Sequence, residues 1–314
     1  MIKWRAAAPA ALAALLSLGS LARPQSSAEP FLGRWDITVT AGSRVYPDWL
    51  EVTSADGRMS ARVQPESGSV HGVTNVAIEN GHLKFTLSAA IKNRPAVTWD
   101  VTVAGGKLTG VENRGSSEAQ LSGVRAPLLK RDPPAQWGAP EPLFDGKDLA
   151  GWEPIGSAQS NWAADNGVLV NRDHGANLRT TSKFDDFKLH IEYNCPDDCN
   201  SGVYLRGRYE VQIEYEPVGR NDRFHEMGAV YGFLAPAVEL PRKPGEWETY
   251  EITLVGRNVT VARDGVTTID RQEIPGITGG ALDADEAAPG PFYLQGDHHG
   301  LLQFRNITIS LPKR

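Results

Sequence analysis

The chain has 314 residues, of which 40% are apolar and 22% charged, and its formal net charge is −6. This is the composition of an ordinary globular protein, and it lacks the basic stripe that nucleic-acid binding requires. The length suits two domains better than one small domain. The 32 glycines and 21 prolines, with many short alternating apolar runs, predict an all-β chain rich in turns.

Residues 1–28 have the pattern of a signal peptide. A positively charged start, MIKWR, precedes an uncharged apolar run over residues 6–21. Small-x-small patterns put the cleavage site after Ala22 or Ala28. The run is short for a membrane-spanning helix and no later run approaches that length. We therefore expect a periplasmic or secreted protein without a transmembrane span, with an uncleaved anchor as the alternative.

Residues 29–127 are predicted to form a small first module of antiparallel strands. Turn signals such as Asn80-Gly81 and Gly105-Gly106 separate its short alternating runs. The Gly-x-Trp opening at Gly33 resembles the start of a lipocalin-like barrel, which implies a small β-barrel, with a sandwich as the alternative. This module carries no recognisable catalytic constellation.

Residues 128–140 are expected to be a linker, because Pro133-Pro134 cannot continue a helix or a central strand. Residues 141–314 form the second module. Two cysteines, Cys195 and Cys199, lie in the segment YNCPDDCN, where the spacing can close a small disulfide loop. A disulfide suits an exported protein. Neither these thiols nor the acidic loops have a diagnostic metal-ligand spacing, so we predict no metal and no cofactor.

The segment NSGVYLRGRYEVQIE, residues 200–214, predicts two short strands joined at Gly207. Because side chains alternate along a strand, one face of the pair is apolar. The other face then carries Tyr204, Arg206, Glu210, Gln212 and Glu214. Long hydrogen-bonding groups of both signs suit a sugar-binding surface. Ordinary cross-strand ion pairs on a solvated face are the alternative.

Several motifs of the second module agree in order and spacing with one known family. They are Asn200-Ser201-Gly202, RGRYEVQ at 206–212, PGEW at 244–247 and FRNI at 304–307. From Leu143 to Ile309 the module resembles the 3-keto-disaccharide hydrolase family, also described as 3-keto-glucoside 1,2-lyase / 3-keto-2-hydroxy-glucal hydratase. The resemblance implies a concanavalin A-like jelly-roll sandwich with one concave, polar sheet. The resemblance does not cover the first module.

The implied activity is the cleavage of 3-keto-glycosides. A ketone at C3 acidifies the hydrogen at C2, so a base can remove it, the C1 substituent can leave, and water can add back. Such a site needs a base, a group that stabilises the oxyanion, and an acid. We expect these catalytic residues: Glu192, Arg206, Glu210 and His298. We expect these substrate-binding residues: Arg208, Gln212, Tyr231 and Gln295.

Each expected residue has a role. Glu192 and Glu210 are the carboxylate candidates for the base, and Arg206 and Arg208 would stabilise the oxyanion. His298 would act as acid or base on a loop. Tyr231, Gln212 and Gln295 would bind the sugar. This requires Glu192 and Arg206 to lie side by side on one sheet, an adjacency that comes from the resemblance.

Two other functions stay open at this point. An ordinary two-carboxylate glycosidase would use Glu210 and Glu214, four residues apart on one strand, although Gln212 stands where an acidic residue is usual. A non-catalytic carbohydrate-binding protein is the second alternative. In each case the expected partner is a carbohydrate and not nucleic acid.

Overall fold

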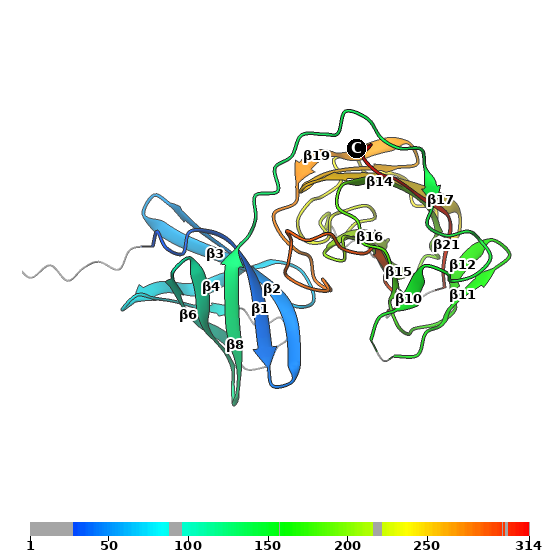
Figure 1. Ribbon diagram of the computed structural model, residues 1–314. Coiled ribbons are helices and arrows are strands. Elements are labelled where there is room, and N and C mark those ends of the chain that lie inside the picture. Colours follow the sequence, from blue (N-terminus) through cyan, green and yellow to red (C-terminus); the bar gives the residue numbers. More distant parts are fainter. Residues whose placement is uncertain are drawn as a thin grey trace, which may run out of the picture.

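The computed structural model describes residues 28–87, 96–156, 158–215, 222–296, 298 and 301–313. Within these ranges every regular element is a β-strand, and no helix there could cross a membrane. The predicted signal peptide lies almost entirely outside the described residues. Figure 1 shows two β units that lie against each other and are joined by one extended connection. The prediction of an all-β chain is confirmed.

The first unit is a closed up-and-down barrel, in which β1 pairs with both β2 and β8. The small antiparallel barrel expected from the sequence is therefore confirmed. Its strands are β1 (Gly33–Ala41), β2 (Arg44–Ala55), β3 (Arg58–Gln64), β4 (His71–Glu79), β5 (His82–Leu87), β6 (Val97–Ala104), β7 (Lys107–Arg114) and β8 (Ser117–Arg125). Apolar side chains such as Trp35, Ile37 and Trp99 fill its interior.

The hairpin turns of the barrel follow the predicted turn signals. At Asn80-Gly81 the φ angles are 52° and 81°, and Glu79 pairs with His82 across the turn. At Gly105-Gly106 they are 56° and 76°. Positive φ at both central residues is the requirement of a type I′ turn, whose twist matches the strands it joins.

The second unit is a sandwich of two antiparallel sheets, as predicted. The smaller sheet contains, in order, β10 (Trp152–Pro154), β13 (Leu178–Thr180), β20 (Tyr293–Leu294), β15 (Asn200–Leu205) and β16 (Tyr209–Glu214). The larger sheet contains, in order, β11 (Trp162–Asp165), β12 (Val168–Asn171), β21 (Leu302–Ser310), β14 (Phe187–Asn194), β17 (Trp247–Val255), β18 (Asn258–Arg263) and β19 (Val266–Glu273), and β9 (Glu141–Pro142) also pairs with β21.

The sandwich core lies between the two sheets. Val203 of β15 and Val211 of β16 meet Leu189 and Ile191 of β14 in one buried cluster. The apolar face predicted for residues 200–214 therefore packs inward, and the polar face points away from the core. A disulfide between Cys195 and Cys199, with Cα atoms 5.6 Å apart, links the end of β14 to the start of β15 as predicted.

The barrel and the sandwich share a buried interface. Trp49 points outward from the barrel strand β2, is fully buried, and packs edge-on against Phe233 with ring centroids 5.5 Å apart. The Arg62 guanidinium lies over both rings. A Cβ atom on Gly276 would lie 2.3 Å from the Trp49 indole nitrogen, so the sandwich backbone passes directly against this ring.

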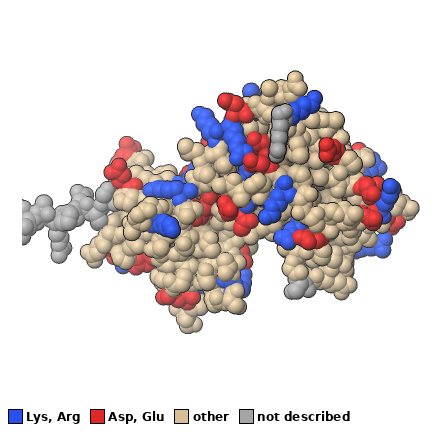
Figure 2. Space-filling view, viewed as in Figure 1, with Lys and Arg blue, Asp and Glu red and all other residues tan. Residues whose placement is uncertain are grey.

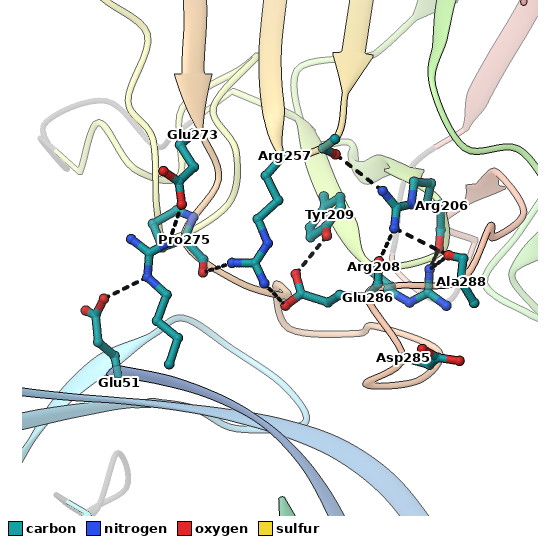
Figure 3. Close-up of polar contacts among 12 residues, drawn as sticks. Glu51, Arg206, Arg208, Tyr209, Arg257, Glu273, Pro275, Asp285, Glu286 and Ala288 are labelled. Atoms are coloured by element: carbon teal, nitrogen blue, oxygen red, sulfur yellow. Dashed lines mark hydrogen bonds and ion pairs between the residues drawn. The ribbon is translucent and has the colours of Figure 1, made fainter. Parts of the chain in front are cut away.

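A buried acidic pair also joins the two units. Asp36 of β1 lies beside Glu286, which accepts hydrogen bonds from the Tyr209 hydroxyl at 2.7 Å and from Arg257. Figure 3 shows Tyr209 and Arg257 converging on Glu286. Burial raises the pKa of Asp36 far above its ordinary value, and the negative charge of Glu286 raises it further. Asp36 therefore stays protonated at neutral pH.

We predict that Trp49→Ala lowers the free energy of unfolding by about 3–5 kcal/mol, because it removes a fully buried indole ring. Urea denaturation followed by circular dichroism measures this loss. Val45→Ala, at an exposed position on the same strand, is the control and should change stability by less than about 0.5 kcal/mol. Equal effects of the two substitutions would contradict a shared core at Trp49.

The protonated Asp36 predicts a pH-dependent stability. Above about pH 4, the usual pKa of aspartate, the unfolded chain releases a proton that the folded protein keeps. The contribution of Asp36 to the free energy of unfolding should then fall as pH rises, by at most about 1.4 kcal/mol per pH unit. Asp36→Asn should make this dependence less steep between about pH 5 and about pH 9 in urea titrations, while the buried Asp48, whose pKa is also raised by burial, keeps its own contribution. Asp56→Asn, on an exposed turn, should leave the slope unchanged.

Candidate functional site

A pocket opens on the polar face of the smaller sheet. It has a volume of about 170 Å³ and is lined by Ser67, Gly68, Asn200, Tyr204, Glu210, Gln212, Tyr231, Gly279, Gly280, Gln295 and His298. Tyr204 comes from β15, and Glu210 and Gln212 come from β16. Their neighbours Val203 and Val211 point into the core, so strand alternation is what turns the polar side chains toward the pocket.

The pocket contains five of the eight residues expected from the sequence, namely Glu210, Gln212, Tyr231, Gln295 and His298. Their roles stay predictions. The sequence analysis missed Asn200, Ser67 and the three glycines 68, 279 and 280, and it missed Tyr204 as a site residue, although alternation had placed Tyr204 on the polar face. In the described part of the chain, no three His, Cys, Asp or Glu side chains gather so as to hold a metal ion.

Glu210 is held in one position at the pocket wall. Its residue is 4% exposed, and its carboxyl group lies across the backbone of β15 at Gly202. A Cβ atom on Gly202 would lie 2.3 Å from Glu210 Oε1, so only glycine leaves room for this side chain. The Glu210 amide donates to Thr278 Oγ1 at 3.0 Å, and its carbonyl accepts from the amide of Tyr231 at 3.1 Å.

Two stacked tyrosines lie beside Glu210. The rings of Tyr204 and Tyr293 are 3.8 Å apart and nearly parallel. Their hydroxyl groups donate to the backbone oxygens of Gly279 at 2.9 Å and Gly280 at 2.5 Å. Burial raises the pKa of the Tyr204 hydroxyl well above its usual range, and the charge of Glu210 adds to this effect. Tyr204 therefore stays a neutral hydrogen-bond donor beside the carboxylate.

Two buried amide oxygens in the pocket have unused hydrogen-bonding capacity. The side-chain oxygens of Gln212 and Gln295 accept no hydrogen bond from any residue that the structure describes. The Gln212 amide nitrogen donates to Glu214 at 3.0 Å, which fixes the orientation of that side chain. Buried acceptors without partners are costly, so each of these two oxygens would be stabilised by a donor from a ligand or from water. Both oxygens suit the hydroxyl groups of a sugar.

The structure does not bring Glu192 into this pocket, so the expectation that it lies beside Arg206 is wrong. Glu192 belongs to β14 in the larger sheet, where it accepts hydrogen bonds of 2.6 Å from both Arg305 and Asn306. Burial raises the pKa of Glu192, but these bonds outweigh it and leave the pKa below its ordinary value. A carboxylate with a lowered pKa in an ion pair is a weak base.

Arg206 and Arg208 also do not line the pocket. The expectation that their side chains contact a substrate there is therefore wrong. Strand β15 ends at Leu205, and Arg206 takes φ = 53° in the turn, so alternation stops there. The buried Arg206 side chain donates to the backbone oxygens of Gly256, Glu286 and Ala288. Figure 3 shows both arginines fastening the loop that contains Glu286 and Ala288.

Arg208 also holds this loop in place. Its guanidinium donates to Asp283 at 2.7 Å and to the backbone oxygen of Ala288 at 2.9 Å. This loop leads from the pocket segment at Gly279–Gly280 to β20, which carries Tyr293. The arginines therefore shape the pocket indirectly, by holding the chain that forms one of its sides.

The charged side chains on the face in Figure 2 and the described residues that line the pocket do not favour a strongly charged ligand. On the face in Figure 2, basic and acidic side chains are interspersed over both units. Among the described residues that line the pocket, Glu210 is the one acidic side chain, and most of the others are neutral amides, hydroxyls and glycines. The pocket therefore suits a neutral, hydroxylated ligand.

We predict a strong coupling between Gly202 and Glu210. Gly202→Ala should destabilise the protein by about 1–3 kcal/mol, because the new methyl group overlaps the Glu210 side chain. In an Glu210→Ala background the same change should cost less, with a coupling energy of about 0.5–3 kcal/mol in a double-mutant cycle. Urea unfolding of the four proteins measures this. Strict additivity would show that the two residues do not meet.

Several solved structures are similar to the sandwich part of this chain. A solved structure of a candidate glycosyl hydrolase from Parabacteroides distasonis is 29% identical over 57% of this chain and 92% of its own, with a TM-score of 0.46. A second from the same organism is 26% identical over 55% and 98%, with a TM-score of 0.43. The carbohydrate-binding module CBM66 from Bacillus subtilis is 14% identical over 51% and 96%, with a TM-score of 0.34.

A search of curated proteins finds no significant match. A family model, in contrast, covers residues 139–310, more than half of the chain and nearly the whole sandwich. It describes the 3-keto-alpha-glucoside-1,2-lyase-like domain. Together with the sugar-sized pocket, this match supports a carbohydrate-active enzyme that acts on glycosides. The protein therefore belongs to the family of 3-keto-alpha-glucoside-1,2-lyase-like domains, which is also the 3-keto-disaccharide hydrolase family.

Proposed function

We propose that the protein cleaves 3-keto-glycosides by elimination followed by hydration, with Glu210 as the base. One observation carries this proposal: a buried carboxylate is fixed in a pocket whose other lining residues are mostly neutral and able to hydrogen-bond sugar hydroxyl groups. Family membership supports the substrate class. The catalytic chemistry needs one base and several hydrogen-bond donors, and this pocket holds that combination.

In the first half-reaction the ketone at C3 makes the C2 hydrogen acidic. Glu210 takes this proton, and the charge that develops on the enediolate is stabilised by donors of the pocket wall. The Tyr231 hydroxyl and the side-chain amides of Asn200 and Gln295 are such donors. They replace the arginines in this role. The C1–O bond then breaks, and the electron pair of the enediolate becomes the C1–C2 double bond.

His298 is the acid that protonates the leaving oxygen. It is exposed and lines the pocket, as the transfer of a proton to a departing group requires. In the second half-reaction water adds its oxygen to C1 and gives one proton to His298, which lost its own to the leaving group, and the proton held by Glu210 returns to C2. The product is a free 3-keto sugar, so the net reaction is hydrolysis.

The rival reading as a two-carboxylate glycosidase is less well supported. It requires Glu210 and Glu214 to flank one sugar bond. Glu214 does not line the pocket, and one of its oxygens accepts a hydrogen bond from Gln212. Cleavage of unoxidised sugars would nevertheless favour this reading, and sugar binding without turnover would favour a carbohydrate-binding protein.

Export to the periplasm or the medium belongs to the same proposal. It rests on the N-terminal sequence pattern and on the disulfide Cys195–Cys199, since disulfides persist in oxidising compartments. Fractionation of cells that express the full chain, with N-terminal sequencing of the product, tests it. A full-length protein in the cytosolic fraction would contradict it.

We predict that the wild-type protein cleaves 3-keto-sucrose or 3-keto-trehalose and leaves the parent sugars intact. Glu210→Gln should reduce kcat by about 100- to 10,000-fold, because it removes the base. Release of the free sugar, measured by chromatography, gives the rates. The pH profile of any residual activity should lose its acidic limb.

Glu192→Gln is the matched control, since it removes a carboxylate on the other sheet that pairs with Arg305. Its activity should equal that of the wild type. An inactive Glu192→Gln beside a fully active Glu210→Gln would exchange the two assignments and overturn the mechanism.

A further inference from the structure

The pocket has a small volume. Its volume of about 170 Å³ lies below the ~300–1,000 Å³ typical of sites that enclose drug-sized ligands. A single sugar ring matches this space. If the proposed function holds, the ketosugar ring occupies the pocket and the substituent on C1 extends through its mouth.

The barrel forms part of that mouth. Ser67 and Gly68 belong to the loop between β3 and β4, yet they line the pocket together with Glu210 and His298 of the sandwich. Ser67, Gly68 and His298 are exposed, whereas Glu210 is buried, so the barrel loop is near the open end. His298 is also the proposed acid for the leaving oxygen. A group that departs from C1 therefore passes close to Ser67.

The loop is held firmly against the sandwich. The amide of Gly280 donates to the backbone oxygen of Glu66 at 2.8 Å. A Cβ atom on Gly279 would lie 2.3 Å from the backbone oxygen of Gly68, which shows how closely the two chains approach. Gln64, the last residue of β3, supports the loop from within the protein: its side-chain amide donates to the backbone oxygens of Pro65 and Gly68 at 2.8 Å each.

A second set of contacts ties the loop to a pocket side chain. Ser69 hydrogen-bonds His225 Nε2, and His225 Nδ1 lies 2.9 Å from Asp222. The His225 ring stacks on Tyr231 with centroids 4.5 Å apart. The barrel loop is thus positioned relative to Tyr231, which lines the pocket. A wall fixed at both ends can discriminate between substrates, because it does not move aside.

We propose that the β3–β4 loop of the barrel forms the leaving-group subsite of the enzyme. Ser67 and Gly68 contact the C1 substituent, while the sandwich holds the ketosugar ring. The subsite takes a hydroxylated group such as a second sugar, because Ser67 and Gly68 offer a hydroxyl and backbone polar groups but no apolar surface. The inference rests on the proposed function and gives the barrel a role in substrate selection.

The test uses Ser67→Trp in the full chain and two substrates. A 3-keto-disaccharide has a leaving group, whereas the 3-keto-2-hydroxy-glucal formed by elimination has only the ring. The indole should lower kcat/KM for the disaccharide by at least about tenfold, the range expected for a steric mismatch in a binding site. The rate of hydration of the glycal should stay unchanged.

Ser54→Trp is the matched control. Ser54 is an exposed serine near the β2–β3 turn, at the opposite end of the barrel from the β3–β4 loop. It should leave both reactions unchanged. Thermal unfolding checks that each variant is folded, and Ser67→Gln takes the place of Ser67→Trp if the latter is not.

Two outcomes overturn the subsite. Equal losses on both substrates would mean that the loop only covers the ring pocket, and no loss on either would remove the loop from the site. A wild-type protein that turns over neither substrate defeats the proposed function instead. Calorimetric titration then decides the subsite, which stands if Ser67→Trp weakens binding of the 3-keto-disaccharide but not of 3-keto-glucose, and falls otherwise.

Discussion

The arrangement of the site depends on one close approach, that of the Glu210 side chain to the bare backbone of Gly202. A carboxyl group can lie across a neighbouring strand only where that strand has no side chain in its path. The backbone of Glu210 is in turn fixed by Thr278 and by the amide of Tyr231. Segments that are far apart in the sequence therefore hold one carboxylate in place together, and the stacked pair Tyr204–Tyr293 lies beside it.

Buried charge has a structural role in this protein. Arg206, Arg208 and Arg257 are almost fully buried. They donate hydrogen bonds to backbone oxygens and to the carboxylates of Asp283 and Glu286. Burying such groups is costly, and the Nε atoms of Arg206 and Arg257 find no partner among the described residues, so these arginines fix geometry more than they add stability. The segment they fix runs between the barrel and the smaller sheet, and it includes both the interface carboxyl Glu286 and the approach to β20 (Figure 3).

Strand periodicity predicted much of the fold and part of the site. It gave the turns at Asn80-Gly81 and Gly105-Gly106, and it placed Tyr204, Glu210 and Gln212 on the polar face of their sheet. Periodicity assigns a residue to a face but not to a sheet, so it could not test the adjacency of Glu192 and Arg206, which was taken from the family resemblance and is wrong. It also fails where a strand ends, as it does at Arg206. Nothing in the local sequence of residues 64–70 indicates that this barrel loop reaches the pocket, since that contact is made only in three dimensions.

The position of the last strand has a consequence for how the molecule is made. β21 lies inside the larger sheet between β12 and β14, and it also pairs with β9. During synthesis the barrel emerges first and can close on its own strands, because β1 and β8 are both present before the sandwich begins. The larger sheet of the sandwich can be completed only after β21 has been synthesised. Assembly can therefore proceed in two stages, in which the N-terminal barrel closes before the larger sheet of the C-terminal unit is complete.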